Sequence, residues 1–499
     1  MIGRLPLLLL CIVGSALTLS IKKPVKFNRK QHLIHGRPWH GFVPSPPKSG
    51  NSVDVPIQQF TQLLDHFDPH NTQTFEQRYW SNNQWYSTEN LIFLSIGGES
   101  INSDAFITDD SLQCAQLAKK YGAMTYSLEH RFYGFSQPTG DMTTDSLKYH
   151  SSRQGLADLA YFIKAMNKQN GYSNPKWILF GGSYAGALAA WAREKYPELV
   201  YGAVATSAPV QAEVDFSQYL ETVQVAFTEF NKDCGDNLHK AFVKLNAFSK
   251  TAAGQNTIPS MFELCEPMDG TNSDDVHYFW QSIISLLMNV VQYGNDNVNP
   301  YNTINNEGGV CSVMSDNTQD PLLSLSYVIQ DLVGLCVETN YKNALKHLQD
   351  VSGSDDRAWV WQTCTEFGFF MSTDSPTAGA FFGDKKKASL SLDWLVNECA
   401  LVFGDSLSNA TVYNAVRSTN DFYGGVKGFN ATRVIFPNGT WDPWHNLSVL
   451  KSPNSESPAI IIEKTAHCAN MYAASPDDPP SLTAARKTID AVVASWVYH

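Results

Sequence analysis

The chain has 499 residues, of which 43% are hydrophobic, 12% aromatic and 17% charged. This composition is typical of a globular protein with a large core, and the length suggests about two to three domains, or one large domain with an insertion. The formal net charge of -12 argues against a nucleic-acid partner, because phosphate binding needs a basic face.

The N-terminus has the pattern of a secretory signal peptide. Arg4 precedes an apolar run at residues 5–13, which small residues follow. The run is shorter than the roughly 20 apolar residues that a membrane span needs. We therefore predict a signal peptide within residues 1–20 and no membrane span, with cleavage after Ala16 or after Ser20.

Residues 21–56 are rich in Lys, Pro and His and lack apolar periodicity, so we predict a propeptide or a loose N-terminal arm. Residues 57–210 follow a different rhythm, in which short apolar runs alternate with helical stretches. This rhythm predicts a parallel sheet covered by helices on both faces. The expected strands lie at residues 91–96, 123–128, 177–180 and 203–205, and the expected helices at 154–166 and 187–196.

The first of these strands ends in Gly97-Gly98-Glu99. Glycines allow a backbone to approach a substrate closely, so Gly98 is a candidate donor to an oxyanion. The alternative is a simple turn. The carboxylate of Glu99 could meet the amino terminus of a substrate.

The sequence Phe180-Gly181-Gly182-Ser183-Tyr184-Ala185-Gly186 joins an expected strand to an expected helix. A nucleophilic serine of an α/β-hydrolase lies on such a turn, where its neighbours must be small. Ala185 stands where the usual motif has Gly, and Gly186 follows it. Ser183 is therefore the candidate nucleophile and the Tyr184 amide a candidate oxyanion donor, whereas the alternative is a Gly-rich turn without catalysis.

Residues 211–425 break the rhythm, because they are aromatic, bear cysteines and favour helices. We predict a large, mostly helical insertion over an α/β core that resumes at residues 426–499. An even number of cysteines remains once the signal peptide is removed, which is compatible with disulfides in a secreted chain. No cysteines form a CxxC pair, so no zinc site, and no other metal or cofactor, is predicted.

In the second part of the core, Asp442 follows an expected strand at residues 433–436. Pro443 biases Asp442 away from helical geometry, which suits a carboxylate presented from a loop. The alternative is an Asp-Pro turn with structural tryptophans. In the catalytic interpretation, Trp441 and Trp444 are candidate substrate contacts.

His467 follows an expected strand at residues 459–463 and precedes an expected helix at 481–497. It completes the order Ser, Asp, His that this fold uses. His445 is too near Asp442 in sequence to come from a separate loop, and His130 precedes Ser183. The predicted triad is therefore Ser183, Asp442 and His467.

Four N-x-S/T sequons, at Asn409, Asn430, Asn438 and Asn446, are candidate glycosylation sites. Together with the signal peptide they indicate the secretory pathway, with a lysosomal, endosomal or secreted destination.

Several motifs in register resemble peptidase family S28, above all its thymus-specific branch. The resemblance covers residue 57 to the end, and its motifs are residues 64–67, 74–80, 129–134, 151–154, 157–158 and 438–444, beside the serine turn. It implies an α/β-hydrolase core with a helical insertion domain over the active site, and the triad and oxyanion positions given above. Arg153 stands where Pro-cleaving members tend to have Glu, which makes Arg153 a candidate substrate contact.

The resemblance also implies three disulfides, Cys234–Cys311, Cys265–Cys336 and Cys364–Cys399, and leaves Cys114 and Cys468 free or paired. Members of the family are often dimers, so a homodimer is compatible with it. The predicted function is hydrolysis of peptide bonds in short peptides or at peptide termini, with a Pro-related preference as one option. A lipase or esterase on the same core and a non-catalytic binding protein are the alternatives.

Overall fold

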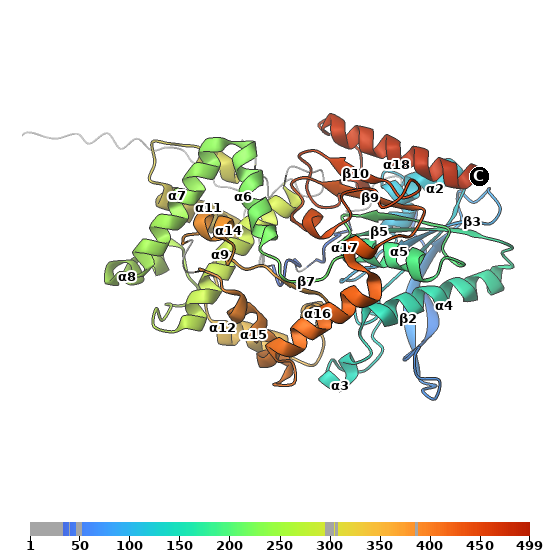
Figure 1. Cartoon of the computed structure of the whole chain (residues 1–499), viewed down its shortest axis with the longest axis horizontal. Helices are drawn as coiled ribbons and strands as arrows, with labels where there is room; N and C mark the ends of the chain where they lie inside the picture. Colours follow the sequence, from blue (N-terminus) through green and yellow to red (C-terminus); the bar gives the residue numbers. More distant parts are fainter. Residues whose placement is uncertain (1–32, 39, 46–51, 295–303, 305–307, 385–387) are drawn as a thin grey trace, which may run out of the picture.

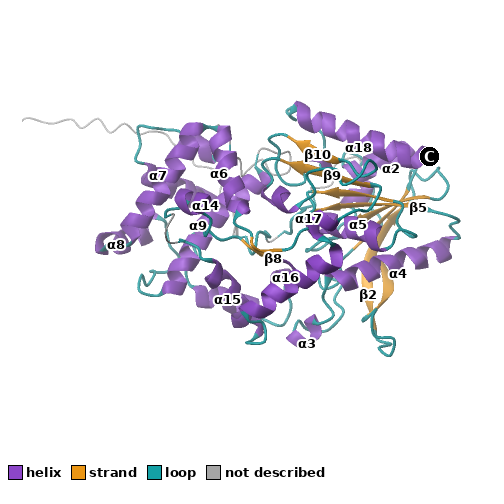
Figure 2. Ribbon diagram, in the orientation of Figure 1, coloured by secondary structure: helices purple, strands orange, loops and turns teal. Residues whose placement is uncertain are grey.

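The computed structural model describes residues 33–38, 40–45, 52–294, 304, 308–384 and 388–499. The predicted signal peptide lies outside these ranges. Figures 1 and 2 show two parts side by side, one built on a sheet and one almost entirely helical.

Eight strands form one sheet in the order β1-β2-β4-β3-β5-β6-β9-β10. β2 pairs antiparallel with both β1 and β4, and the other neighbours are parallel. The two antiparallel strands were not predicted; a connection of ten residues joins them, and so short a link permits only antiparallel pairing. The strands are β1 (Gln58–Leu63), β2 (Thr74–Asn82), β3 (Leu91–Ile96), β4 (Met124–Leu128), β5 (Lys176–Gly182), β6 (Gly202–Thr206), β9 (Val434–Gly439) and β10 (Ala459–Ile462).

Helices cover both faces of this sheet. α2 (Gln113–Tyr121) and α18 (Pro480–Tyr498) cover one face, and α4 (Ser152–Asn170) and α5 (Ser183–Lys195) cover the other. Successive strand side chains point to opposite faces, so Phe93 packs in the first layer and Leu94 in the second. Every residue of β3 is buried, as expected of a strand between two helical layers. Two short helices, α1 (Ala105–Thr108) and α3 (Thr144–Leu147), complete the first half of the core.

The helical part is inserted between β6 and β9. Many of its buried apolar residues belong to one cluster with those of the sheet, and others form a second cluster together with Phe132 and Tyr133 of the core. The insertion therefore shares the core of the molecule. Its elements are β7 (Glu213–Asp215), α6 (Gln218–Phe230), α7 (Lys232–Ser249), α8 (Ala252–Met261), α9 (Ser273–Tyr293), α10 (Val310–Met314), α11 (Pro321–Val333), α12 (Tyr341–Gln349), α13 (Asp355–Gln362), η1 (Thr363–Phe367), β8 (Gly368–Phe370), α14 (Pro376–Phe381), α15 (Leu392–Phe403), α16 (Asn409–Tyr423) and α17 (Gly425–Gly428).

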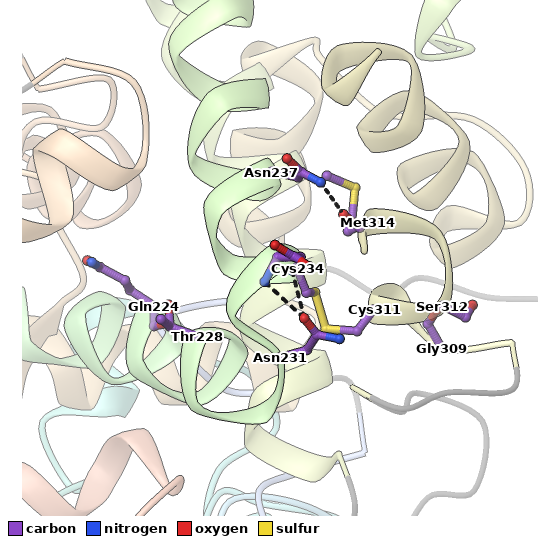
Figure 3. Close-up of a disulfide and its surroundings, with 10 residues drawn as sticks. Gln224, Thr228, Asn231, Cys234, Asn237, Gly309, Cys311, Ser312 and Met314 are labelled. Atoms are coloured by element: carbon purple, nitrogen blue, oxygen red, sulfur yellow. Dashed lines mark hydrogen bonds between the residues drawn. A yellow bond between two sulfur atoms is a disulfide. The ribbon is translucent and has the colours of Figure 1, made fainter. Parts of the chain in front are cut away.

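Three disulfides cross-link the insertion, and they are the pairs that the resemblance implies: Cys234–Cys311, Cys265–Cys336 and Cys364–Cys399. The first joins α7 to α10, beside a hydrogen bond from Asn237 to the Met314 carbonyl (Figure 3). Cys114 and Cys468 are free and buried.

The Cys234–Cys311 bridge spans 77 residues, and cross-links over long loops restrict the unfolded chain most. We expect the double change Cys234→Ser and Cys311→Ser to lower the free energy of unfolding by about 2–5 kcal/mol. Denaturant unfolding of the two proteins measures the loss. The matched control is Cys114→Ala, which changes a buried cysteine that closes no loop; a loss no larger than the control's would contradict the prediction.

Residues 33–38 and 40–45, hereafter the arm, are packed into the protein. Leu33, His35, Arg37 and Phe42 are all buried. Arg37 forms an ion pair with Asp356 of the insertion, so the arm is held by charge as well as by apolar packing. The prediction of a loose segment is therefore wrong for these residues, because neither composition nor periodicity reveals partners hundreds of residues away.

Candidate active site

Ser183 lies where β5 ends and α5 begins. Its φ of +57° is in the left-handed region, which a non-glycine residue seldom adopts. This backbone conformation is the strained strand-to-helix turn on which α/β-hydrolases carry their nucleophile.

The glycines of this turn lie where a side chain would collide with neighbouring atoms. A Cβ on Gly181 would clash with the Ala185 carbonyl, and one on Gly186 would lie 2.7 Å from the Thr206 carbonyl of β6. Of the residues after the serine, the one that must lack a side chain is therefore Gly186 rather than residue 185. This explains why the motif functions structurally with Ala185 two residues after the serine.

Asp442 and His467 are in direct contact. Nδ1 of His467 lies 2.8 Å from Oδ1 of Asp442, and both side chains are fully buried. The same carboxylate oxygen accepts a hydrogen bond from the Trp444 amide at 3.0 Å, which fixes its orientation. Burial alone would lower the pKa of His467, but the Asp442 carboxylate outweighs it and the pKa is raised.

The loops that carry these residues follow the C-terminal ends of neighbouring parallel strands. Gly182 pairs with Thr206, and Gly439 pairs with Ile462. A Cβ on Gly182, directly before Ser183, would lie 2.9 Å from Sγ of Cys468, directly after His467. The serine loop and the histidine loop are therefore packed against each other at the edge where this fold class places its sites.

The histidine loop is fixed by hydrogen bonds to the end of β6. Ser207 accepts from the Cys468 amide at 3.0 Å, and the buried Asn470 side chain lies 3.0 Å from Oγ1 of Thr206. Within the described part of the chain, Nε2 of His467 has no hydrogen-bond partner. That nitrogen is therefore available to take a proton.

The two competing histidines have other contacts. His445 Nδ1 bonds to the backbone carbonyl of Asp442 rather than to its carboxylate. His130 bonds through Nε2 to the hydroxyl of Tyr184, and burial lowers its pKa to about 4. Neither contact suits a base for Ser183.

The glycine loop after β3 lies beside the turn. A Cβ on Gly98 would lie 3.7 Å from the Cβ of Ala185. A cavity of about 30 Å³ lies between them, lined by residues that include Gly98, Glu99, Gly182 and Ala185. A cavity of this volume is large enough to admit water. The roles of the Gly98 and Tyr184 amides as oxyanion donors remain predictions.

Glu99 is buried, and its Oε1 accepts a hydrogen bond from the Phe42 amide at 2.6 Å. Its Oε2 has no hydrogen-bond partner among the described residues. Burial raises the pKa of Glu99, although the Phe42 amide and the Arg37 guanidinium oppose the shift. The Glu99 carboxylate therefore binds a backbone N–H group, and in this structure that group belongs to Phe42 of the same chain.

A cluster of buried aromatic rings adjoins His467. The Phe42 ring lies edge-on to Trp359 and Trp444, with centroids 5.2 and 4.9 Å apart, and 5.9 Å from the ring of His467. Gln292 at the end of α9 accepts from the Trp444 indole at 2.8 Å, and its carbonyl accepts from the His467 amide. Sequence reasoning missed Phe42, Trp359 and Gln292, because none of them belongs to a motif.

Two predicted substrate contacts, Arg153 and Trp441, interact with side chains of the insertion. The guanidinium of Arg153 stacks on Phe422 of α16 at 4.1 Å, and Nη2 reaches Ser418. The Trp441 indole donates to Glu229 of α6 at 2.9 Å. Trp444 is the only predicted tryptophan contact that packs against His467.

The four sequons differ in exposure. Asn409 and Asn430 are exposed, and Asn446 is half-buried with its amide donating to Thr222 at 2.8 Å. Asn438 is buried in β9 and donates to two backbone carbonyls. The prediction of a glycosylation site is therefore wrong for Asn438, since a glycan needs an asparagine at the surface.

Among the described residues, no helix has the length and apolarity to cross a membrane. The same residues contain no group of three or more His, Cys, Asp or Glu side chains placed to hold a metal ion.

Comparisons with known proteins agree on one family. The family model "Serine carboxypeptidase S28" matches residues 62–489. A Caenorhabditis elegans protein that carries a serine protease name is 39% identical, over 99% of each chain. The thymus-specific serine protease of Mus musculus is 35% identical, over 87% of this chain and 85% of its own. The lysosomal Pro-X carboxypeptidase of Homo sapiens is 27% identical, over 98% and 96%.

Among solved structures, a proline iminopeptidase of Mycobacterium smegmatis matches 88% of this chain and 98% of its own, with 11% identity and a TM-score of 0.37. An esterase of Pyrobaculum calidifontis matches 90% and 88%, with 12% identity and a TM-score of 0.35.

Proposed function

The chain belongs to the serine carboxypeptidase S28 family and is a serine-type peptidase with an α/β-hydrolase core, and from this premise we propose that Ser183, Asp442 and His467 are its catalytic triad. The observation that carries the proposal is the buried contact between Asp442 and His467, on a loop packed against the strained turn of Ser183.

In the proposed reaction, Oγ of Ser183 attacks the carbonyl carbon of a peptide bond while Nε2 of His467 takes the hydroxyl proton. The oxygen of the tetrahedral intermediate is held by the amides of Tyr184 and Gly98. His467 then gives its proton to the leaving amine, and an acyl-enzyme ester remains on Ser183. Water hydrolyses this ester through the same steps, and Asp442 keeps the imidazole oriented throughout.

Digestion of a peptide library, read by mass spectrometry at acid and neutral pH, tests this function. We expect cleavage products from the wild-type protein and none from the Ser183→Ala variant. The same assay, run with acyl esters beside Pro-containing peptides, separates a peptidase from the lipase or esterase alternative. Binding of the peptides without product from either protein would support the third alternative, a binding protein. Equal product formation by wild type and variant would contradict the role of Ser183.

We propose that Glu99 binds the free amino terminus of a substrate, because its buried carboxylate already accepts one backbone N–H and Oε2 has no partner in the described chain. Hydrogen bonds to charged groups contribute about 1.5–3 kcal/mol. We therefore expect Glu99→Gln to lower kcat/KM about 10- to 100-fold for peptides with a free amino terminus, and much less for their acetylated counterparts. An unchanged ratio between the two peptide sets would contradict this role.

The three disulfides and the predicted signal peptide support a proposed location in the secretory pathway, in the lysosome or outside the cell. A homodimer is proposed from the family resemblance alone. Sedimentation of the purified protein at several concentrations gives its oligomeric state.

A further inference from the structure

The arm passes over both catalytic loops. Phe42 packs against His467, and a Cβ on Gly182, next to Ser183, would lie 2.8 Å from a methyl carbon of Val43. Two consecutive arm residues thus contact the histidine loop and the serine loop. Among the described residues, the arm is the only segment outside the core and the insertion that contacts these two loops.

The backbone of the arm is held by polar groups on both sides of the site. The Phe42 amide donates to Glu99 of the core, and the Phe42 carbonyl accepts from the Tyr293 hydroxyl of α9 at 3.0 Å. A substrate peptide would present the same amide and carbonyl groups. Because the Phe42 carbonyl bonds to Tyr293, it is directed to the insertion rather than to the proposed oxyanion donors, which would protect the arm from hydrolysis.

The arm also closes the site. Ser183 is 1% exposed, and Asp442 and His467 are both 0% exposed. The cavity that remains between Val43, Gly98 and Gly182 has a volume of about 30 Å³. Two larger cavities, of about 460 and 540 Å³, are lined by none of the triad residues. Because Ser183 is almost fully buried and the arm lies against its loop, a peptide could contact Ser183 only after the covering residues move, and Val43 is one of them.

Contacts remote from the triad hold the arm in place. Arg37 is ion-paired with Asp356 and donates through Nε to the Glu99 carbonyl at 2.7 Å. His35 lies 3.1 Å from the carboxylate of Glu398, and its carbonyl accepts from the Trp359 indole at 3.2 Å. The arm is thus fastened to both halves of the molecule.

We propose that the arm is an intramolecular inhibitor, in which Phe42 fills the side-chain subsite next to Ser183 and activity requires release of the arm. The subsite would then take an apolar side chain of a peptide substrate. Residues 52–57 offer a site for release by proteolysis, since they lie outside any helix or strand and most of them are exposed. This inference rests on the proposed function, because only a catalytic Ser183 can be inhibited.

The experiment replaces residues 52–57 with the recognition sequence of a site-specific protease and follows labelling of Ser183 by a fluorophosphonate probe. Apparent reactivity scales with the fraction of molecules in the open state. We expect cleavage and removal of the arm to raise the labelling rate at least about tenfold. A synthetic peptide of residues 33–45 should restore inhibition, and the same peptide with Phe42→Ala should bind about tenfold more weakly or worse.

A second variant keeps the test valid if the cleaved protein unfolds. Phe42→Ala in the intact chain empties the subsite but retains the Arg37 and His35 anchors, so it should also label faster. The matched control is Phe382→Ala, which removes an equally buried ring inside the insertion, packed on Phe242 and Phe381. It should not label faster than the wild type.

The outcomes separate the two proposals. Equal labelling of Ser183 in the intact chain, the cleaved chain and Phe42→Ala would overturn the inhibitor role and leave the peptidase assignment standing. Mass spectrometry can show whether the arm has left the cleaved protein. If the arm has left and Ser183 is still not labelled, both proposals are overturned. Faster labelling of the control Phe382→Ala together with Phe42→Ala would also overturn the inhibitor role, because general loosening would then explain the effect.

Discussion

Ser183→Ala is expected to lower kcat for peptide hydrolysis by about a million-fold and to abolish fluorophosphonate labelling. The reason is that no other described hydroxyl lies on a strained strand-to-helix turn beside the loop of His467. The measurement combines single-turnover kinetics with mass spectrometry of the labelled protein.

The matched control for this prediction is Ser207→Ala. Ser207 also follows a central strand and also has a positive φ, of 48°, but its hydroxyl accepts from the Cys468 amide. Its removal should weaken the support of the histidine loop and still leave a labelled protein. Labelling that survives in Ser183→Ala, or that disappears only in Ser207→Ala, would contradict the assignment of the nucleophile.

Asp442→Asn is expected to lower kcat by about 10⁴-fold while the protein stays folded, because the amide would hold His467 in the wrong tautomer. A pH effect should accompany the loss. The Asp442 carboxylate raises the pKa of His467, and the base must be neutral to accept the serine proton. Activity should therefore fall as the pH drops through the raised pKa in the wild type. Without the negative charge that pKa decreases, so the acid limb of the variant should move to lower pH.

The pH dependence of kcat/KM for wild type and variant measures this shift. The control is Asp490→Asn, which removes a carboxylate from a surface ion pair with Lys120 and should change neither the rate nor the profile. An acid limb that stays in place in Asp442→Asn, or moves to higher pH, would show that Asp442 is not the partner of the catalytic base.

The parallel part of the sheet could be predicted from the sequence because each of its strands is a short apolar run bounded by turn residues. Residues 91–96, for example, are buried on both faces and are apolar except for Ser95. β2 could not be recognised in the same way, since two of its buried positions hold the polar residues Gln77 and Asn82, so that apolar and polar residues do not alternate along it. The burial of the arm depends on Asp356 and Glu398, which are more than 300 residues away, and no local pattern reports such contacts.

In the candidate site, too, some residues could be predicted from the sequence and others could not. The order of Ser183, Asp442 and His467 led to two side chains that are in contact, because a conserved topology relates chain order to position at the sheet edge. Arg153 was assigned by its position in a motif, but its guanidinium stacks on Phe422 of the insertion. Trp359 and Phe42 meet beside His467 only through the tertiary fold.

The measurement that tests the central claim most directly is a crystal structure of the protein after reaction with a fluorophosphonate. The account predicts phosphorus bonded to Oγ of Ser183, Nε2 of His467 within about 3 Å of the adduct, and the phosphoryl oxygen directed at the amides of Tyr184 and Gly98. An adduct on another residue, or a His467 ring turned away from Ser183, would contradict it.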